Sequence, residues 1–454
     1  MFIHPTKFNE LLRSLLVLSW ICLTLASDTN EFFECGGDIN FRTTSDAISH
    51  ASQQGNLETA KYLFEQLFYA CIRSANNCAT ALNIAAKEGH FEIVHYLIEN
   101  GANVTENEDF LIHAAKGGDL FSVQHVIESG INLRVGVWKK AGYKALIRAI
   151  QAKHIDIVNY LIETGVKVTK CFASRLGNTP LLYAAEDGLF DVVKVLIEKG
   201  ANVNDRDKRR NTTLMFAAKA GNAEIVQLCI KNGADVNASN FSFDNVLSLA
   251  CESGSLETVQ TLVKSGAKVN SNENSILDSA IQGGNFDILQ LLIKKGAYVN
   301  PPFNLYSFPP LISAVKAENL RMVQCLIENG ADLNVNYSGT RTALKRAAKT
   351  GNLEIVKLLV DNGAEVSAKP NESPLRYAIK GGNPAVVEFL IRKGAKMSGS
   401  KSYSTLVHAV ECGSVDVVKI LIKNGAKIHF QNCERALSHA IETGKTEIVR
   451  ILSE

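Results

Sequence analysis

The chain has 454 residues, of which 46% are hydrophobic, and a formal net charge of +2. This apolar fraction is ordinary for a folded protein, and the near balance of basic and acidic residues gives no general reason to expect nucleic acid as a partner. A chain this long would usually divide into two or three globular domains. A domain of stacked repeats can be longer than a globular domain, because it grows along one axis.

Residues 1–27 differ from the rest of the chain. Lys7 and Arg13 precede an apolar run over 15–26, and Ser27 and Asp28 follow it. This order of basic, apolar and small residues is typical of a secretory signal peptide, and the run is too short for a transmembrane helix. An amphipathic helix, or a cap on the first repeat, is the alternative interpretation.

We therefore expect a signal peptide in residues 1–27, a lead-in segment in 28–45 and a repeat domain over 46–454. If the signal functions, the protein enters the secretory pathway; otherwise it is cytoplasmic. No other segment has the length and apolar character to span a membrane.

The repeated pattern is clearest in residues 85–104, which read AAKEGHFEIVHYLIENGANV. Two alanines at its start allow a neighbouring helix to approach closely. Gly89 can adopt the left-handed conformation that ends a helix. Val94, Leu97 and Ile98 then follow at helical spacing and form one apolar stripe. The stretch therefore predicts helix, tight turn, helix and a second glycine stop.

The glycine between the two helices recurs every 29 to 36 residues, with His154 and Asn319 placed in two gaps, and defines 13 units. Two short helices cannot bury their own apolar stripes, so each unit needs a copy on either side. The recurring positions are Gly55, Gly89, Gly118, Gly188, Gly221, Gly254, Gly284, Gly351, Gly382, Gly413 and Gly444.

One unit contains a sequence typical of a known family. Thr179, Pro180 and Leu181 are followed by Ala184 and Ala185, and with a period near 33 this phrase resembles the ankyrin repeat. The resemblance covers roughly residues 46–454. It implies an all-α solenoid of about 13 helix–turn–helix units with short hairpin-like loops. It also implies a non-catalytic scaffold that binds a protein partner through its concave face and projecting loops.

Start signals for the second helices follow the recurring glycine. The next residue is often Asn, Ser or Asp, which are good N-caps, and an acidic residue follows in the first helical turn of many units. The first-turn position gives these acidic residues a structural role, so we do not interpret them as catalytic. The expected N-caps are Asn56, Asp119, Asn222, Ser255, Asn285, Asn352, Asn383 and Ser414.

The connecting loops vary most between units, and we expect them to carry the partner-binding residues. Residues 134–144 are predicted to form a long basic loop, and 301–310 a loop whose proline pairs exclude a helix. Exposed aromatic residues anchor many protein interfaces, although these could instead fold back onto the repeats. The candidates are Trp138, Tyr143, Phe241, Phe243, Phe303, Tyr306 and Phe308.

Motifs that carry chemistry are incomplete. His90 and His95 lie five residues apart, so they do not share a helix face as metal ligands would. The sequence Gly444-Lys445-Thr446 resembles the end of a phosphate-binding loop, but the glycine required earlier is absent. We therefore predict no catalytic residue, no metal ligand and no cofactor site, and nucleic acid is not an expected partner.

Two functional hypotheses follow. The first is a non-catalytic interaction scaffold, and the second is a secreted or targeting adaptor whose repeats recognise a host or cell-surface protein. The N-terminal segment would decide between the compartments. An enzyme is disfavoured, because the repeats leave no room for a catalytic domain.

Overall fold

The computed structural model describes residues 82–83, 85–87, 89–100, 102–105, 108–169, 178–270, 275–302, 309–335, 342–367, 373–397, 405–426 and 430–453. The predicted signal peptide, lead-in and first repeat lie outside them. In this part of the chain the secondary structure is helical, apart from isolated bridge residues such as the antiparallel pair Ser239 and Asn245. The all-α prediction is therefore confirmed. None of the helices described is long and apolar enough to cross a membrane.

The chain divides into two compact units, Met1–Lys208 and Arg209–Glu454. The first contains α5 (Phe91–Glu99), α6 (Glu108–Gly117), α7 (Leu120–Glu128), α8 (Gly136–Ala152), α9 (Ile155–Glu163), α10 (Pro180–Glu186) and α11 (Phe190–Glu198). The second contains α12 (Thr213–Lys219), α13 (Ala223–Lys231), α14 (Val246–Glu252), α15 (Leu256–Lys264), α16 (Ile276–Gln282), α17 (Phe286–Lys294), α18 (Pro310–Lys316), α19 (Leu320–Glu328), α20 (Ala343–Thr350), α21 (Leu353–Asp361), α22 (Pro374–Gly381), α23 (Pro384–Arg392), α24 (Thr405–Cys412), α25 (Val415–Lys423), α26 (Phe430–Glu442) and α27 (Thr446–Ser453).

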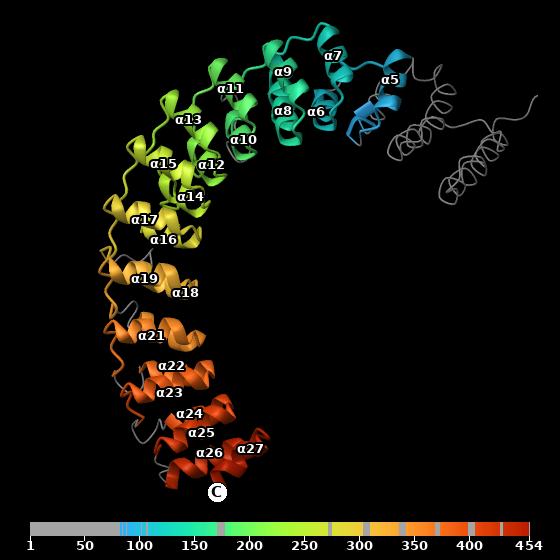
Figure 1. The fold of residues 1–454 in the computed structure, drawn as a ribbon. Coiled ribbons are helices and arrows are strands. Elements are labelled where there is room, and N and C mark those ends of the chain that lie inside the picture. The colour runs from blue at the N-terminus through green and yellow to red at the C-terminus, as the bar shows by residue number, and fades with distance from the viewer. Residues whose placement is uncertain are drawn as a thin grey trace, which may run out of the picture. The chain divides into compact units, whose positions relative to one another are not determined.

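Within each unit the helices form successive pairs that stack on one another (Figure 1). The first helix of a pair packs on the first helix of the next pair, as α12 does on α14 and α20 on α22. Second helices likewise pack on second helices, as α13 does on α15. Each unit is therefore built of two helical layers, and its contacts join neighbouring repeats.

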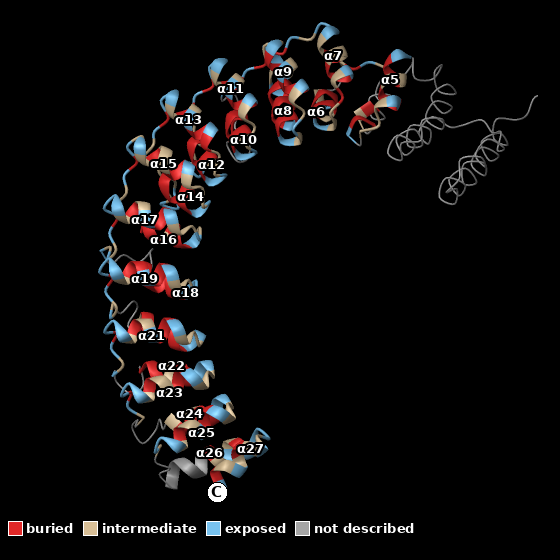
Figure 2. Cartoon of the chain, viewed as in Figure 1, coloured by how far each residue is buried: buried red, intermediate tan, exposed pale blue. Residues whose placement is uncertain are grey.

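The core lies between these layers and between successive pairs, and the ribbon of Figure 2 is coloured as buried along the facing sides of the helices. In α12, Leu214, Ala217 and Ala218 are fully buried, and in α13 so are Ile225 and Val226. The small alanines allow the first helices to approach closely. Burying one leucine or isoleucine side chain contributes about 1.5–3 kcal/mol, so the repeated stripe supplies the main stabilising free energy.

In the described part of the chain the recurring glycines adopt the left-handed conformation that the pattern predicts; Gly221, for example, has φ +68°. The assignment of His154 and Asn319 to the two gaps is wrong by one residue. Lys153 (φ +63°) and Glu318 (φ +52°) occupy the glycine position. His154 and Asn319 are instead the N-caps of α9 and α19. The turn geometry is set by packing of the helices, so two non-glycine residues are held in a conformation that costs about 1–2 kcal/mol.

The predicted N-caps are largely confirmed. Their side chains accept a hydrogen bond from a backbone N–H in the first turn, which satisfies a donor that the helix leaves unpaired. Ser414 occupies the N-cap position of α25 but makes no such bond, and Asn56 lies outside the described residues. The caps that accept this bond are Asp119, Asn222, Ser255, Asn285, Asn352 and Asn383.

Asparagines in the loops link five successive repeats of the second unit, from the loop after α13 to the loop after α21. Asn270 donates through Nδ2 to the carbonyl of Gly296 (2.8 Å) and accepts through Oδ1 from the N–H of Tyr298 (2.9 Å). Asn237, Asn300 and Asn334 occupy equivalent positions and each accept a bond from a backbone N–H one repeat further on. We call Asn237, Asn270, Asn300 and Asn334 the asparagine ladder. It fixes the loops of successive repeats relative to one another.

Replacing Glu318 by glycine is expected to stabilise the protein by about 0.5–1 kcal/mol, because glycine adopts the left-handed conformation without steric cost. Urea denaturation followed by circular dichroism measures the change. The neighbouring residue Ala317 has right-handed backbone geometry, so Ala317→Gly is the matched control and should destabilise by about 0.5 kcal/mol. Destabilisation by Glu318→Gly would contradict the assigned turn geometry.

Replacing Asn270 by alanine should accelerate exchange of the Tyr298 amide by about tenfold. The variant loses the hydrogen bonds to the Tyr298 N–H and to the Gly296 carbonyl, each with a net contribution of about 1 kcal/mol. Hydrogen–deuterium exchange of the peptide that contains Tyr298 measures this effect. Gln227→Ala, at an exposed position of α13, is the control and should leave that exchange unchanged. Equal protection in both variants would show that the ladder adds no stability.

Candidate protein-interaction surfaces

The prediction that residues 134–144 form a loop is wrong, because α8 begins at Gly136 and runs for 17 residues. Val135 provides an extended N-cap, and Ala141 and Ala145 are buried in the helix that follows. The basic residues of this stretch, together with Trp138 and Tyr143, favoured a loop from the sequence. Packing of buried residues such as Ala141 and Ala145 extends α8 to 17 residues, where α6 has 10 and α10 has 7.

Within this helix, the two predicted partner-binding residues Trp138 and Tyr143 differ in their exposure. Tyr143 is only 3% exposed, so its ring belongs to the core and is not available to a partner. Trp138 lies in the first turn of α8 and is half-buried. Phe303, Tyr306 and Phe308 lie outside the described residues, and their partner-binding role stays a prediction.

Phe241 and Phe243 occupy the tip of a short hairpin between α13 and α14, as expected. Phe241 is 64% exposed and Phe243 is 42% exposed. The side chain of Asn240 organises this tip by accepting through Oδ1 from the N–H groups of Ser242 (2.9 Å) and Asp244 (3.0 Å). The hairpin thus holds two aromatic rings in solvent on an ordered backbone.

Contacts with the preceding hairpin add to this order. Asn240 donates through Nδ2 to Oδ1 of Asn211 (2.9 Å), and the N–H of Phe241 donates to the carbonyl of Arg209 (3.0 Å). The guanidinium of Arg210 lies 5.7 Å from the centroid of the Phe241 ring, within cation–π range. Four non-glycine residues among those described have positive φ, and Arg210 (+67°) and Phe243 (+65°) are two of them. Strain of this kind persists where the surrounding contacts fix it, often at binding sites.

A second feature is an open groove of about 520 Å³ over the second helices α15, α17 and α19. Leu256, Leu291 and Ile293 supply apolar surface, and Asp287 and Lys294 supply charges. Next to it, the guanidinium of Arg321 stacks 3.8 Å from the centroid of the Phe286 ring. The groove has mixed polarity and does not concentrate groups of one chemical kind.

Two buried cysteines of the second unit have a structural role. Cys229 and Cys251 are buried, as their positions on helix faces predict, and burial raises the pKa of the Cys229 thiol to about 12. A thiol held neutral in this way behaves as a small apolar group. Within the described ranges, no group of three or more His, Cys, Asp or Glu residues is placed to hold a metal ion.

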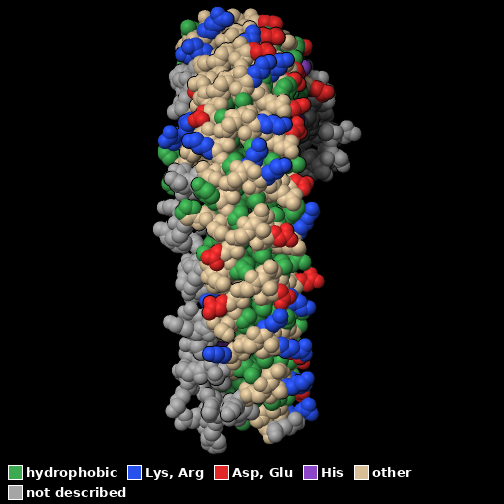
Figure 3. Space-filling model, turned by 60° about the vertical axis from the view of Figure 1, so that its left-hand side comes forward, with side chains coloured by type: hydrophobic (Ala, Val, Ile, Leu, Met, Phe, Trp, Pro, Cys, Tyr) green, Lys and Arg blue, Asp and Glu red, His purple; other side chains and the backbone are tan. Residues whose placement is uncertain are grey.

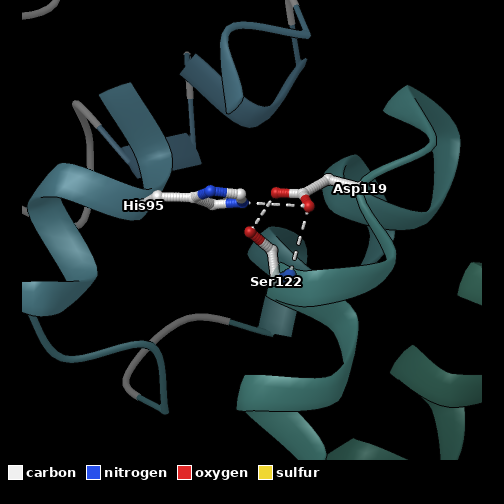
Figure 4. Close-up of polar contacts among 3 residues, drawn as sticks. All are labelled: His95, Asp119 and Ser122. Atoms are coloured by element: carbon white, nitrogen blue, oxygen red, sulfur yellow. Dashed lines mark hydrogen bonds and ion pairs between the residues drawn. The ribbon is translucent and has the colours of Figure 1, made fainter. Parts of the chain in front are cut away.

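His95, Asp119 and Ser122 come together in the first unit (Figure 4). Asp119 Oδ1 lies 3.2 Å from Nε2 of His95 and accepts from the N–H of Ser122, and the Ser122 hydroxyl donates to Oδ2. In a nucleophilic triad the serine would contact the histidine, and the carboxylate would contact the opposite ring nitrogen. Here both residues bind one buried carboxylate. The cluster is therefore the N-cap of α7, tied to α5 of the preceding repeat.

The surface carries charges of both signs. On the face that Figure 3 draws, Lys, Arg, Asp and Glu are interspersed, with hydrophobic side chains among polar ones. This distribution agrees with a formal net charge of only +2. Recognition on this face therefore has to depend on local groups more than on a long-range field.

Comparison with known proteins supplies the family. A family model of ankyrin repeats, three copies in each match, matches residues 24–108, 103–171, 164–240, 214–302, 304–370 and 368–432. Among solved structures, the crystal structure of the human ASB11 ankyrin repeat domain is 27% identical, covers 49% of this chain and 100% of that chain, and has a TM-score of 0.44. No curated protein matches.

The family match spans most of the chain, and the helix pairs, left-handed glycines and loop asparagines repeat with the same period. The resemblance inferred from the Thr-Pro-Leu phrase and the spacing near 33 is therefore confirmed. The chain belongs to the ankyrin repeat family.

Proposed function

We propose that the protein is a non-catalytic interaction scaffold that binds a protein partner through its hairpin tips and the exposed surface of its first helices. Ankyrin repeats generally mediate protein–protein interaction, which supports the class of function. The hairpin at Phe241 and Phe243 is the observation that carries the proposal for this chain.

The hairpin has the features of an interface anchor. Its two exposed rings offer a large apolar contact area, and aromatic residues are enriched among those that dominate binding energy. The bonds from Asn240 order the backbone before binding, so less conformational entropy is lost when a partner docks. Arg210 adds a cation beside one ring.

The test places a photo-crosslinking phenylalanine analogue at position 241 of the full chain and identifies the crosslinked proteins by mass spectrometry. We expect a discrete partner at this position and none with the analogue at Tyr298, an aromatic in another loop that is 54% exposed. Once the partner is purified, Phe241→Ala should weaken binding about 30-fold, the effect of losing an anchor worth about 2 kcal/mol.

The thermal unfolding midpoint of the Phe241→Ala variant should stay unchanged, because the ring is mostly in solvent. Failure to crosslink any protein at position 241, or equal affinity of the variant, would contradict the proposed role of the hairpin. A large loss of stability would show instead that the ring is part of the fold.

We also propose secretion as the alternative setting of this function, on the basis of the sequence of residues 1–27 alone. Expression in a eukaryotic secretory cell tests it. The exported protein should have a mass that corresponds to a start near Asp28, as cleavage after the apolar run requires. A protein that retains Met1 and stays in the cell would favour a cytoplasmic scaffold.

A further inference from the structure

We propose that three successive first helices of the second unit, α18, α20 and α22, form a docking site for a short, extended, acidic segment of a protein partner. The inference rests on the proposed scaffold function and specifies the chemistry of one partner segment. The charged side chains of these helices carry the argument.

The three helices read PLISAVK, ALKRAAKT and PLRYAIKG, and they contain six basic residues and no acidic one. Lys345 is buried in α20, and the other five are exposed or half-buried. We call these five the basic patch: Lys316, Arg346, Lys349, Arg376 and Lys380.

The helices bring this charge together in space. They pack consecutively, α18 on α20 and α20 on α22, and Lys316, Lys349 and Lys380 occupy the same position in each. Gly381 brings the last two helices close, because a Cβ atom there would clash with the carbonyl oxygen of Lys349. Like charges on adjacent helices repel one another, and an anionic partner relieves that repulsion.

Arg346 lies on α20, the middle helix of the patch, and is half-buried. Its Nε atom is buried and has no hydrogen-bond partner in the described part of the chain. A guanidinium binds a carboxylate through two parallel hydrogen bonds when both donors of one edge are available. The Nε atom is shielded from solvent, so a docked carboxylate would contact the guanidinium through its other N–H donors.

Acidic residues lie on the helices at both ends of the patch and limit its length. Asp278 of α16 precedes it, and Glu411 of α24 occupies the position that the three lysines hold in their helices. With about 10 Å between packed helices, the patch is about 20 Å long. An extended peptide advances about 3.3 Å per residue, so about six residues fit.

This length favours a peptide over a nucleic acid or a membrane. A longer polyanion would continue past the patch and meet the acidic side chains of α16 and α24, where like charges repel it. A short acidic segment can end before it reaches them. The near-neutral charge of the whole chain also provides little attraction for a polyanion outside the patch.

The test measures binding of a fluorescein-labelled peptide that carries six consecutive glutamates, by fluorescence anisotropy with the full chain. We expect binding that weakens by about tenfold between about 50 and 300 mM salt, since exposed ion pairs are screened. The same peptide with six glutamines should not bind measurably. The variant K316Q/K349Q/K380Q should weaken binding of the glutamate peptide by about tenfold.

The matched control is K264Q/K295Q/K357Q, which removes the same charge from exposed positions on or beside the second helices of the same unit. It should change the affinity less than about twofold, because these lysines lie outside the patch. Circular dichroism checks that both variants keep their helical content. An equal loss in both variants, or equal binding of the glutamine peptide, would overturn the proposal.

Two competing ligands complete the test. If single-stranded poly-dT or phosphatidylserine vesicles bind more tightly than the glutamate peptide and lose binding in K316Q/K349Q/K380Q, the patch serves a different macromolecule and the proposal is wrong. Failure of the peptide to bind would also overturn it. None of these results depends on crosslinking at position 241, so the scaffold function can stand when the acidic site does not.

Discussion

Burial between neighbouring repeats is the interaction on which the rest of this structure depends. A pair of helices of seven to ten residues exposes an apolar stripe that it cannot cover by itself. In the second unit, α12 covers its stripe against α13 and α14, and each following pair does the same. Stability is therefore local and additive along each unit, and any repeat can change its exposed residues while its buried ones stay constrained.

Polar backbone groups at the repeat junctions are satisfied by the same small set of side chains. N-cap residues such as Asn285 pair with the first turn of their own helix and also reach back, through Nδ2, to the carbonyl of Gly254 in the preceding repeat (3.0 Å). The asparagine ladder does the same on the loop side. These bonds hold the loops in register, so the hairpin tips are presented in an ordered way.

The exposed residues of the second unit differ in chemistry from one repeat to another. The Phe241 hairpin offers aromatic surface on an ordered backbone, and the basic patch offers positive charge on helical positions whose spacing the stack fixes. Both are in the second unit, and each is built from residues of one repeat or of adjacent repeats. The second unit therefore presents two separate local features at its surface.

The sequence by itself determined the period, the helix pairs, most N-caps and the positions of the buried stripes, because each depends on residues close together in the chain. It also placed Phe241 and Phe243 in a connecting loop but left open whether their rings are exposed, which the structure shows. Only the tertiary structure decided that Lys153 and Glu318 take the glycine position. It also decided that Trp138 belongs to helix α8 and that the Tyr143 ring is buried in the core. The asparagine ladder and the basic patch likewise join residues about 30 positions apart, and the packing of one repeat on the next brings them together.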